Sequence, residues 1–259
     1  MAIYEYEHFH YAGYDSEDFG AIQASVNSGL FEETVVSNVN IIESRIRGQA
    51  KSYLHSVDQD PIEFELNVFF NEEYSDDDID NAKKWLSQRT YQPFYVIGSS
   101  KRKIIYCMPT GEIKLSHNGA GQGYLTVTMH SNSYHMYSPV NSTQTYDLSS
   151  NPSAGTVINL GNSGDIGMKP TITIQTTVAG DIRIVNESNS NDELKFIGLA
   201  NAETIVIDCE REDIQTDLPS TYRYGNSNLN FLELPKGLNK LRVYGKCKIS
   251  FKYEYIYIA

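Results

Sequence analysis

The sequence predicts a mostly β protein of two domains, the first of which carries one helix. Most of the 259 residues fall into short segments that alternate apolar and polar side chains, with Gly, Asn or Pro between them. This period-two pattern is typical of strands, and only one segment has helical periodicity. With 40% hydrophobic and 12% aromatic residues, the chain has enough apolar side chains to bury a core in each domain.

The strands are expected in two groups. The first group is AIQASVN (21–27), IEFELNVFF (62–70), RKIIYCM (102–108), EIKLSH (112–117) and YLTVTMHS (124–131). The second group is TITIQTTV (171–178), DIRIVNE (181–187), LKFIGL (194–199), TIVIDCE (204–210), FLELP (231–235) and LRVYGKCKISFKYEYIYI (241–258). Each group is large enough to build a β domain.

The helix is expected over SDDDIDNAKKWLSQR (75–89). Ser75 and Asp78 form a capping-box pattern, and the neighbouring aspartates lie near the positive end of the helix dipole. Ile79, Ala82 and Leu86 form one apolar stripe, with Trp85 beside it. This amphipathic pattern predicts a helix that packs on a sheet.

The domain boundary is expected between residues 129 and 146, where the chain becomes rich in Ser, Asn and Thr around Pro139. We predict a first domain over 1–138, a sheet or barrel-like sandwich with the helix, and a second domain over 139–259, an antiparallel sandwich. The last strand is expected either to close the second domain or to return to the first. Its aromatic and aliphatic faces favour a strand covered on both sides.

Charge and cysteine content exclude several classes of protein. A formal charge of −12 argues against a surface that binds phosphate backbones. Cys107, Cys209 and Cys247 are far apart and odd in number, which favours reduced thiols and synthesis in a cytosol. The first residues lack the features of a signal peptide, and no apolar run reaches the length of a membrane span.

Calcium and phosphate sites are both disfavoured. Asp76, Asp78 and Asp80 resemble the start of an EF-hand loop, but Asn81 and Ser87 stand where a Gly and a Glu are required. GAGQG (119–123) lies between two strands and predicts a hairpin turn, because a phosphate loop must open a helix. GNSGD (161–165) lacks the GxSxG spacing of a nucleophile elbow.

Other polar clusters also have structural explanations. His8 and His10 lie on one side of an extended segment, but without a third ligand nearby they favour a surface pair over a metal site. Adjacent carboxylates occur in Glu32–Glu33, Glu72–Glu73 and around Glu210, Glu212 and Asp213. A glycosidase needs two carboxylates across a cleft, which adjacency in sequence does not establish. We therefore assign no catalytic, cofactor-binding or metal-binding residue.

Several segments, taken together and in order, resemble the distal tail protein family of long, non-contractile-tailed bacteriophages. FHYAGYDSEDFGAIQ (9–23), which contains Gly13 and Gly20, is similar to the family's opening segment. DPIEFELNVFF, AKKWL, PFYVIGSSKRKIIYCMPTG and GYLTVTMHSNSYHMYSP follow in the family's order of elements. NLGNSGDIGMKPTITI (159–174), TIVIDCERED (204–213) and NFLELPKGLNKLRVYG (230–245) are similar to its C-terminal signatures.

The resemblance implies a structural protein of the virion, located at the distal tail tip and made in the host bacterial cytoplasm. It implies a hexameric ring of N-terminal domains, with galectin-like C-terminal domains pointing outward. Its partners would be the tail tube protein, the tail-associated tip protein and receptor-binding proteins, without specific nucleic-acid binding or membrane insertion. No cofactor is implied. Gly13, Gly20, Asp165, Pro170, Gly237, Asn239 and Gly245 would then be turn and packing positions.

Two other functions are compatible with the residues. A carbohydrate-binding module could use the tyrosines of the second domain to contact host wall polysaccharide, since aromatic faces stack on sugars. A glycoside hydrolase could use one of the carboxylate pairs. Titration of wall polysaccharide against tyrosine variants, and assays for turnover, would distinguish these functions from a structural role.

Overall fold

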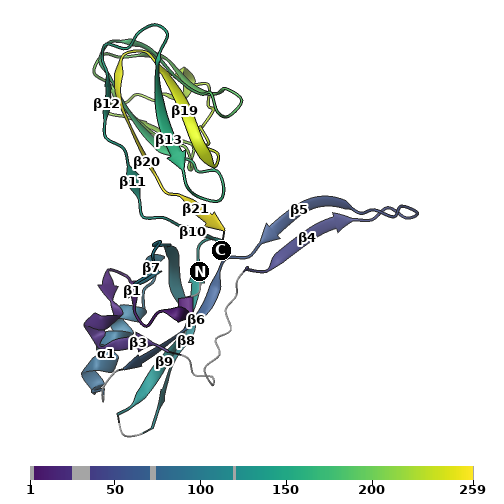
Figure 1. Ribbon diagram of the computed structural model, residues 1–259, viewed down its shortest axis with the longest axis vertical. Coiled ribbons are helices and arrows are strands. Elements are labelled where there is room, and N and C mark those ends of the chain that lie inside the picture. Colours follow the sequence, from purple (N-terminus) through teal and green to yellow (C-terminus); the bar gives the residue numbers. More distant parts are fainter. Residues whose placement is uncertain (1–2, 25–35, 71–73, 119–120, 259) are drawn as a thin grey trace. The chain divides into compact units, whose positions relative to one another are not determined.

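The chain forms two compact units. The computed structural model describes residues 3–24, 36–70, 74–118 and 121–258. The first unit is Met1–Tyr137 with Ile258–Ala259, and the second is Ser138–Tyr257. The described residues form several antiparallel sheets and one α-helix, which confirms the mostly β prediction (Figure 1). No helix among them is long and apolar enough to cross a membrane.

The first unit is built on a seven-stranded antiparallel sheet of order β2-β1-β7-β8-β9-β6-β3. Its strands are β1 (Phe9–Tyr11), β2 (Tyr14–Asp15), β3 (Ala21–Gln23), β6 (Glu63–Phe70), β7 (Gln92–Val96), β8 (Ile105–His117) and β9 (Gly123–Ser131). Leu66 and Val68 of β6 lie opposite Val127 and Leu125 of β9, and all four side chains are buried. Period-two alternation therefore builds one face of the core, as the sequence predicts.

Helix α1 (Asp76–Leu86) begins where the capping box predicts and ends three residues before Arg89. Ser75 Oγ accepts the Asp78 N–H at 3.3 Å, and Asp78 Oδ2 accepts the Ser75 N–H at 2.9 Å. The stripe of Ile79, Ala82 and Leu86 is buried. Trp85, also buried, stacks on Phe9 and Phe19 and donates its indole N–H to the Tyr11 carbonyl at 2.8 Å.

A two-stranded hairpin leaves the body of the first unit. Strands β4 (Val39–Ser44) and β5 (Tyr53–Gln59) pair only with each other among the described strands. A tip segment, residues 45–52, joins them, and Gly48 has the positive φ of 91° that its turn requires. We call residues 39–59 the arm. Figure 1 shows it as a ribbon that extends away from the sheet. The remaining elements of this unit are η1 (Ile3–Glu5), η2 (Ser16–Phe19) and β10 (His135–Tyr137).

The second unit is a sandwich of two antiparallel sheets. One sheet has the order β11-β20-β14-β17-β18, with β12 also paired to β20, and the other has the order β13-β19-β15-β16. The bounds are β11 (Asn141–Ser142), β12 (Tyr146–Leu148), β13 (Thr156–Asn162), β14 (Thr171–Thr176), β15 (Gly180–Asn186), β16 (Asp192–Leu199), β17 (Thr204–Asp208), β18 (Asp213–Thr216), η3 (Tyr224–Asn226), β19 (Gly237–Tyr244), β20 (Cys247–Tyr253) and β21 (Ile256–Ile258).

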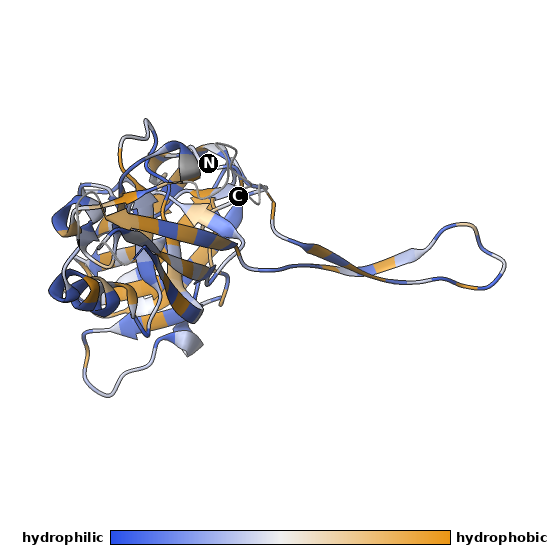
Figure 2. Ribbon diagram, turned by 90° about the horizontal axis from the view of Figure 1, so that it is seen from below, coloured by the Kyte–Doolittle hydropathy of each residue, from blue (hydrophilic) through white to orange (hydrophobic). Residues whose placement is uncertain are grey.

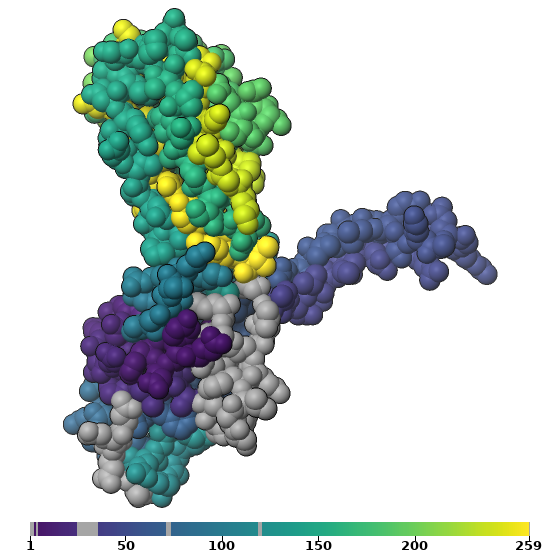
Figure 3. Space-filling model, in the orientation of Figure 1, coloured from purple at the N-terminus to yellow at the C-terminus, as the bar shows by residue number. Residues whose placement is uncertain are grey.

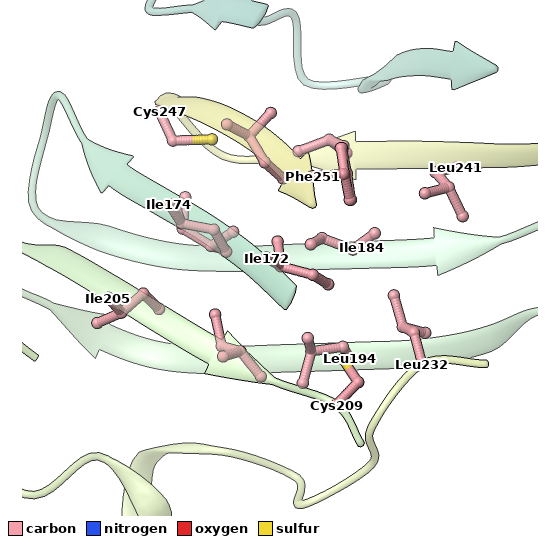
Figure 4. Close-up of a cluster of buried hydrophobic side chains, with 14 of the residues drawn as sticks. Ile172, Ile174, Ile184, Leu194, Ile205, Cys209, Leu232, Leu241, Cys247 and Phe251 are labelled. Carbon is pink, nitrogen blue, oxygen red and sulfur yellow. The ribbon is translucent and has the colours of Figure 1, made fainter. Parts of the chain in front are cut away.

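The core of the second unit fills the space between its sheets. Figure 4 shows Ile172, Ile205 and Phe251 of one sheet facing Ile184 and Leu241 of the other. These five side chains are each at most 1% exposed. Burial of this many aliphatic side chains, each contributing about 1.5 to 3 kcal/mol, is the main stabilising term of the unit.

Three strand predictions need correction. The single strand expected over 241–258 is three strands, because Gly245 turns the chain between β19 and β20 and a second break precedes β21. Strand β20 lies inside its sheet, but only one of its faces is covered. Cys247, Ile249 and Phe251 are buried on that face, whereas Lys248 and Lys252 on the opposite face are exposed.

FLELP (231–235) forms no regular strand, although Leu232 and Leu234 are buried as the alternation predicts. Its only ladder contact is an isolated bridge between Leu234 and Met168. In the first unit, the two strands expected over 102–108 and 112–117 are one bulged strand, β8. Strand β3 ends at Gln23, and residues 25–27 lie outside the described residues.

Candidate subunit-interaction surfaces

The three cysteines are free and buried, as the sequence predicts. Burial raises the pKa of Cys247 to about 11 and that of Cys209 to about 12, and it raises the pKa of Cys107 further. A thiol must ionise to act as a nucleophile or a metal ligand. These side chains are therefore core residues at neutral pH.

The predicted surface histidines each lie beside a carboxylate. His8 Nε2 lies 3.3 Å from Glu17 Oε1, and His10 Nδ1 lies 2.5 Å from Asp15 Oδ1. The His10 ring also stacks on Tyr95. Within the described parts of the chain, no group of three or more His, Cys, Asp or Glu side chains could hold a metal ion.

The EF-hand-like aspartates serve helix α1. The Ser75 hydroxyl and N–H both donate to Asp78 and hold the pKa of its carboxyl below the ordinary value. Asp80 pairs with Lys83 at 3.0 Å one turn along. Asp78 therefore caps the helix, and Asp80 belongs to an ion pair on its surface.

The remaining motifs fall in loops and turns. GAGQG separates the paired strands β8 and β9, and two of its residues, 119 and 120, lie outside the described residues. GNSGD begins with the last two residues of β13 and continues into a turn in which Asn162 Oδ1 accepts the Gly164 N–H at 2.8 Å. Glu32–Glu33 and Glu72–Glu73 are also outside the described residues. Asp213 accepts hydrogen bonds from Tyr224 and Gln215.

The arm exposes aliphatic side chains on both strands. Ile41 is 62% exposed and lies directly opposite Val57, which is 54% exposed. The other exposed apolar residues of the arm are Val39, Ile42, Ile46, Tyr53 and Leu54. Figure 2 shows these hydrophobic segments as orange bands on the projecting ribbon, and Figure 3 shows that its side chains stand clear of the sheet.

Such an arm is poorly stabilised by its own contacts. An isolated two-stranded hairpin is marginal in water, because it buries little apolar surface on either face. Exposed apolar patches on a folded protein mark surfaces that contact another molecule. The arm is therefore the strongest candidate interaction element in the described part of the chain.

A second candidate surface is an open groove beside helix α1, with a volume of about 880 Å³. Its aromatic lining consists of Tyr14, Phe19, Phe70, Tyr74 and Trp85. Phe19 stacks on Trp85 with ring centroids 4.3 Å apart, and Tyr14 meets Phe19 edge to face. The buried Trp85 forms the base of this stack, which holds the more exposed rings in fixed positions.

Polar side chains complete this groove, which we call the aromatic groove. Asp18, Asp78, Asn81, Lys84 and Gln88 belong to its lining. Asp18 Oδ2 accepts the Asp15 N–H at 3.0 Å, so the carboxylate is held by the turn that precedes η2. The groove thus combines aromatic faces with two carboxylates and one lysine.

The chain matches known protein families over nearly its whole length. A family described as "Phage tail protein N-terminal domain" matches residues 4–133. A second, described as "Phage tail C-terminal domain", matches residues 137–253. The chain belongs to this phage tail protein family. A curated relative of the tail protein is an SPbeta prophage-derived uncharacterized protein of Bacillus subtilis (strain 168), YomH, 26% identical over 257 residues, which are 99% of the chain and 100% of the relative.

Solved structures share the fold of the tail protein. The Dit protein of phage SPP1, described as a paradigm of the hub adsorption apparatus in phages that infect Gram-positive hosts, superposes with a TM-score of 0.67 at 16% identity, over 96% of this chain and 98% of that one. A chain of the phage P2 baseplate, in its activated conformation with calcium, gives 0.53 at 7% identity, over 93% and 92%. The resemblance to distal tail proteins is therefore confirmed at the level of a phage tail protein with this fold.

The sequence did not reveal either interaction surface of the tail protein. NVNIIES and SYLHSVDQ, on the two sides of Gly48, contain the residues of the arm, but their apolar side chains do not alternate cleanly. The aromatic groove joins residues 14–20 to Phe70 and residues 74–88, and no local spacing links these segments. A hairpin signal around Gly48 was the one detectable feature.

Proposed function

We propose that the tail protein assembles into a homohexameric ring at the distal end of the phage tail. The ring would act as a hub that joins the tail tube protein, the tail-associated tip protein and the receptor-binding proteins during host adsorption. Residues 1–138 would form the ring, and the galectin-like residues 139–259 would carry the outward contacts. This role needs no catalytic group or cofactor, and DNA would pass through the ring without specific binding.

The arm is the observation that carries this proposal. A closed ring of identical copies is built from head-to-tail contacts, in which one patch of each copy meets a different patch of the next. A projecting hairpin with exposed aliphatic residues can supply one side of such a contact. The strands of the arm are six and seven residues long, about 20 Å at the usual rise per residue, so the tip lies well beyond its own sheet.

The comparisons support the hub role. The SPP1 Dit protein is described as a paradigm of a hub adsorption apparatus, and two further similar structures are chains of the phage P2 baseplate. Their fold extends over more than nine-tenths of this chain, so both units are included. The specific partners of this tail protein are inferred from that likeness of fold.

Negative-stain microscopy combined with mass measurement of the purified full chain tests the proposal. We expect sixfold rings, or two stacked rings, with a mass that is a multiple of six chains. A protein that remains monomeric at every concentration, and that also fails to assemble with tail partners, would contradict the hub role.

Substitutions in the arm separate assembly from folding. Ile41→Asn with Val57→Asn places two polar side chains on one exposed face, so we expect weaker ring formation without loss of the folded unit. The matched control is Val178→Asn with Ile197→Asn, because both residues are 52% exposed and lie in the second unit. Equal effects of the two pairs on ring formation would show that the arm has no special role.

A further inference from the structure

The tip of the arm is positively charged in an acidic protein. Residues 45–52 read RIRGQAKS and carry Arg45, Arg47 and Lys51 with no carboxylate, although the whole chain has a formal charge of −12. All three cationic residues are exposed, and so is Ile46 between the two arginines. The tip thus presents three cations and one aliphatic side chain.

The aromatic groove has the complementary chemistry. Asp18 and Asp78 lie in its lining, and Asp76 and Asp77 occupy the same end of α1, against Lys84 alone as a cation in the lining. Guanidinium groups interact favourably with carboxylates and with the faces of tyrosine and tryptophan rings. The same unit already has such a contact, since Arg102 lies over the Tyr95 ring at 4.4 Å.

The arm and the groove lie on different sides of the first unit. Figures 1 and 2 both draw α1 on one side of the sheet and the arm on the other. An arm that points away from its own groove is free to reach the groove of another copy. This is the arrangement that a heterologous contact requires, and repetition of the contact can close a ring.

We propose that the arm tip of one copy, residues 45–52, binds in the aromatic groove of the next copy. Ile46 packs on the aromatic side chains, and Arg45 and Arg47 face the carboxylates of the groove. This inference rests on the proposed ring and assigns it a specific contact between subunits. Because charges contribute to the contact, high salt weakens it.

Engineered cysteines test the contact directly. Ile46→Cys in the tip and Asn81→Cys in the groove lining are both on exposed residues, and the three native cysteines are buried. In the full chain, the double variant should form a ladder of disulfide-linked oligomers under mild oxidation, up to a closed six-chain species. A reductant should convert these oligomers back to single chains. Each single variant should lack this ladder. The matched control pair is Ile46→Cys with Ser116→Cys, an exposed residue of β8 outside the groove lining.

The outcomes separate this contact from the ring itself. Sixfold rings without a ladder from Ile46→Cys/Asn81→Cys would overturn the docking of the tip and leave the hub role intact. A ladder of equal strength from the Ser116 control would also overturn it, because the bond would then report random collision. Absence of both rings and ladder would contradict the hub role as well.

Charge reversal gives a second, independent measurement. Arg45→Glu with Arg47→Glu should weaken ring assembly roughly tenfold or more, because charge-matched contacts become repulsive. Lys240→Glu with Lys246→Glu changes the net charge equally on exposed residues of the second unit and should not weaken assembly. Trp85 is the single tryptophan, so its fluorescence should change on assembly of the wild type. Equal weakening by both pairs would overturn the tip contact.

Discussion

At the residue scale, the buried ion pair of Glu203 and Arg223 is the most demanding polar contact of the second unit. The Glu203 side chain is fully buried, and Arg223 donates to both of its oxygens at 2.7 Å. Ala200 N–H and the Thr216 hydroxyl donate to the same carboxylate. A buried charge with four donors is satisfied, and removal of its cation leaves an uncompensated charge in the interior.

We expect Arg223→Ala to destabilise the second unit by about 3 to 5 kcal/mol at pH 7. Urea unfolding measures the loss. Trp85 lies in the first unit, so the transition that circular dichroism records without a change in Trp85 fluorescence is that of the second unit. Arg211→Ala removes the cation of an exposed pair with Asp208 and should cost less than about 1 kcal/mol. Equal losses in the two variants would show that burial of the pair is unimportant.

The same pair predicts a pH dependence. Burial alone would raise the pKa of Glu203, but hydrogen bonds from Arg223, Ala200 and Thr216 lower it below the ordinary value. Its contribution to stability is therefore present above the pKa of an unfolded glutamate, about 4.3, and is lost as the pH falls through the lower folded value. Without Arg223, burial raises the pKa of Glu203 in the variant, so the stability difference between wild type and Arg223→Ala should be largest at neutral pH. It should shrink in acid as the carboxylate is protonated first in the variant and then in the wild type. A difference that stays constant to low pH would contradict this assignment.

Gly245 is a second residue at which side-chain size decides stability. It turns the chain between β19 and β20 with a φ of 91°, and a Cβ there would collide with the Asp181 carbonyl oxygen and the Ile182 side chain. We expect Gly245→Ala to cost more than about 1 kcal/mol, because strain and collision add. Gly161→Ala is the control, since a Cβ at that position meets no atom within 4 Å. The two variants should differ clearly in the urea midpoint of the second unit.

At the scale of elements, an asparagine loop protects the edge strand β16. Asn228 mimics a neighbouring strand residue: its N–H donates to the Lys195 carbonyl, its Oδ1 accepts the Lys195 N–H, and its Nδ2 donates to the Glu193 carbonyl. Asn226 and Asn230 donate to the same strand. Covering an edge in this way prevents strand pairing with another chain.

Asn228→Ala should therefore expose part of the β16 edge. We expect a loss of about 1 kcal/mol in the second unit, from two side-chain hydrogen bonds at an exposed position, and faster aggregation on heating. Urea unfolding and light scattering measure the two effects. Asn201→Ala, at an exposed turn of the same unit, is the control. Aggregation rates that do not differ between the variants would contradict an edge-protecting role.

The elements that the sequence predicts well are those whose local signals agree with their burial. Helix α1 has a capping box and an apolar stripe, and the structure uses both. The arm was missed because neither of its faces packs on a core, so no period-two pattern is imposed on it. FLELP has the right alternation, but its one β-bridge is the isolated pairing of Leu234 with Met168. The alternation of apolar and polar residues indicates which side chains are buried. It does not predict strand pairing, because pairing depends on partners far away in the sequence.

At the scale of the whole molecule, the two surfaces proposed for contact between subunits, the arm and the aromatic groove, belong to the first unit. The arm and the aromatic groove both lie within Met1–Tyr137, whereas the large aliphatic core of the second unit is complete within Ser138–Tyr257. We propose that the chain divides at residue 138 into a ring-forming part and a galectin-like part. This proposal implies that each part folds independently, and expression of the separate parts tests it.

We expect the fragment 138–257 to fold alone and remain monomeric. Its core is formed by strands of one continuous segment, so separation from the first unit removes none of these buried side chains. Circular dichroism should show one cooperative thermal transition, and mass measurement should give a single chain at all concentrations. The full chain should form rings under the same conditions, because only it has the arm and the groove. An unfolded fragment would contradict independent folding, and rings made by the fragment would place the assembly contacts in the second unit instead.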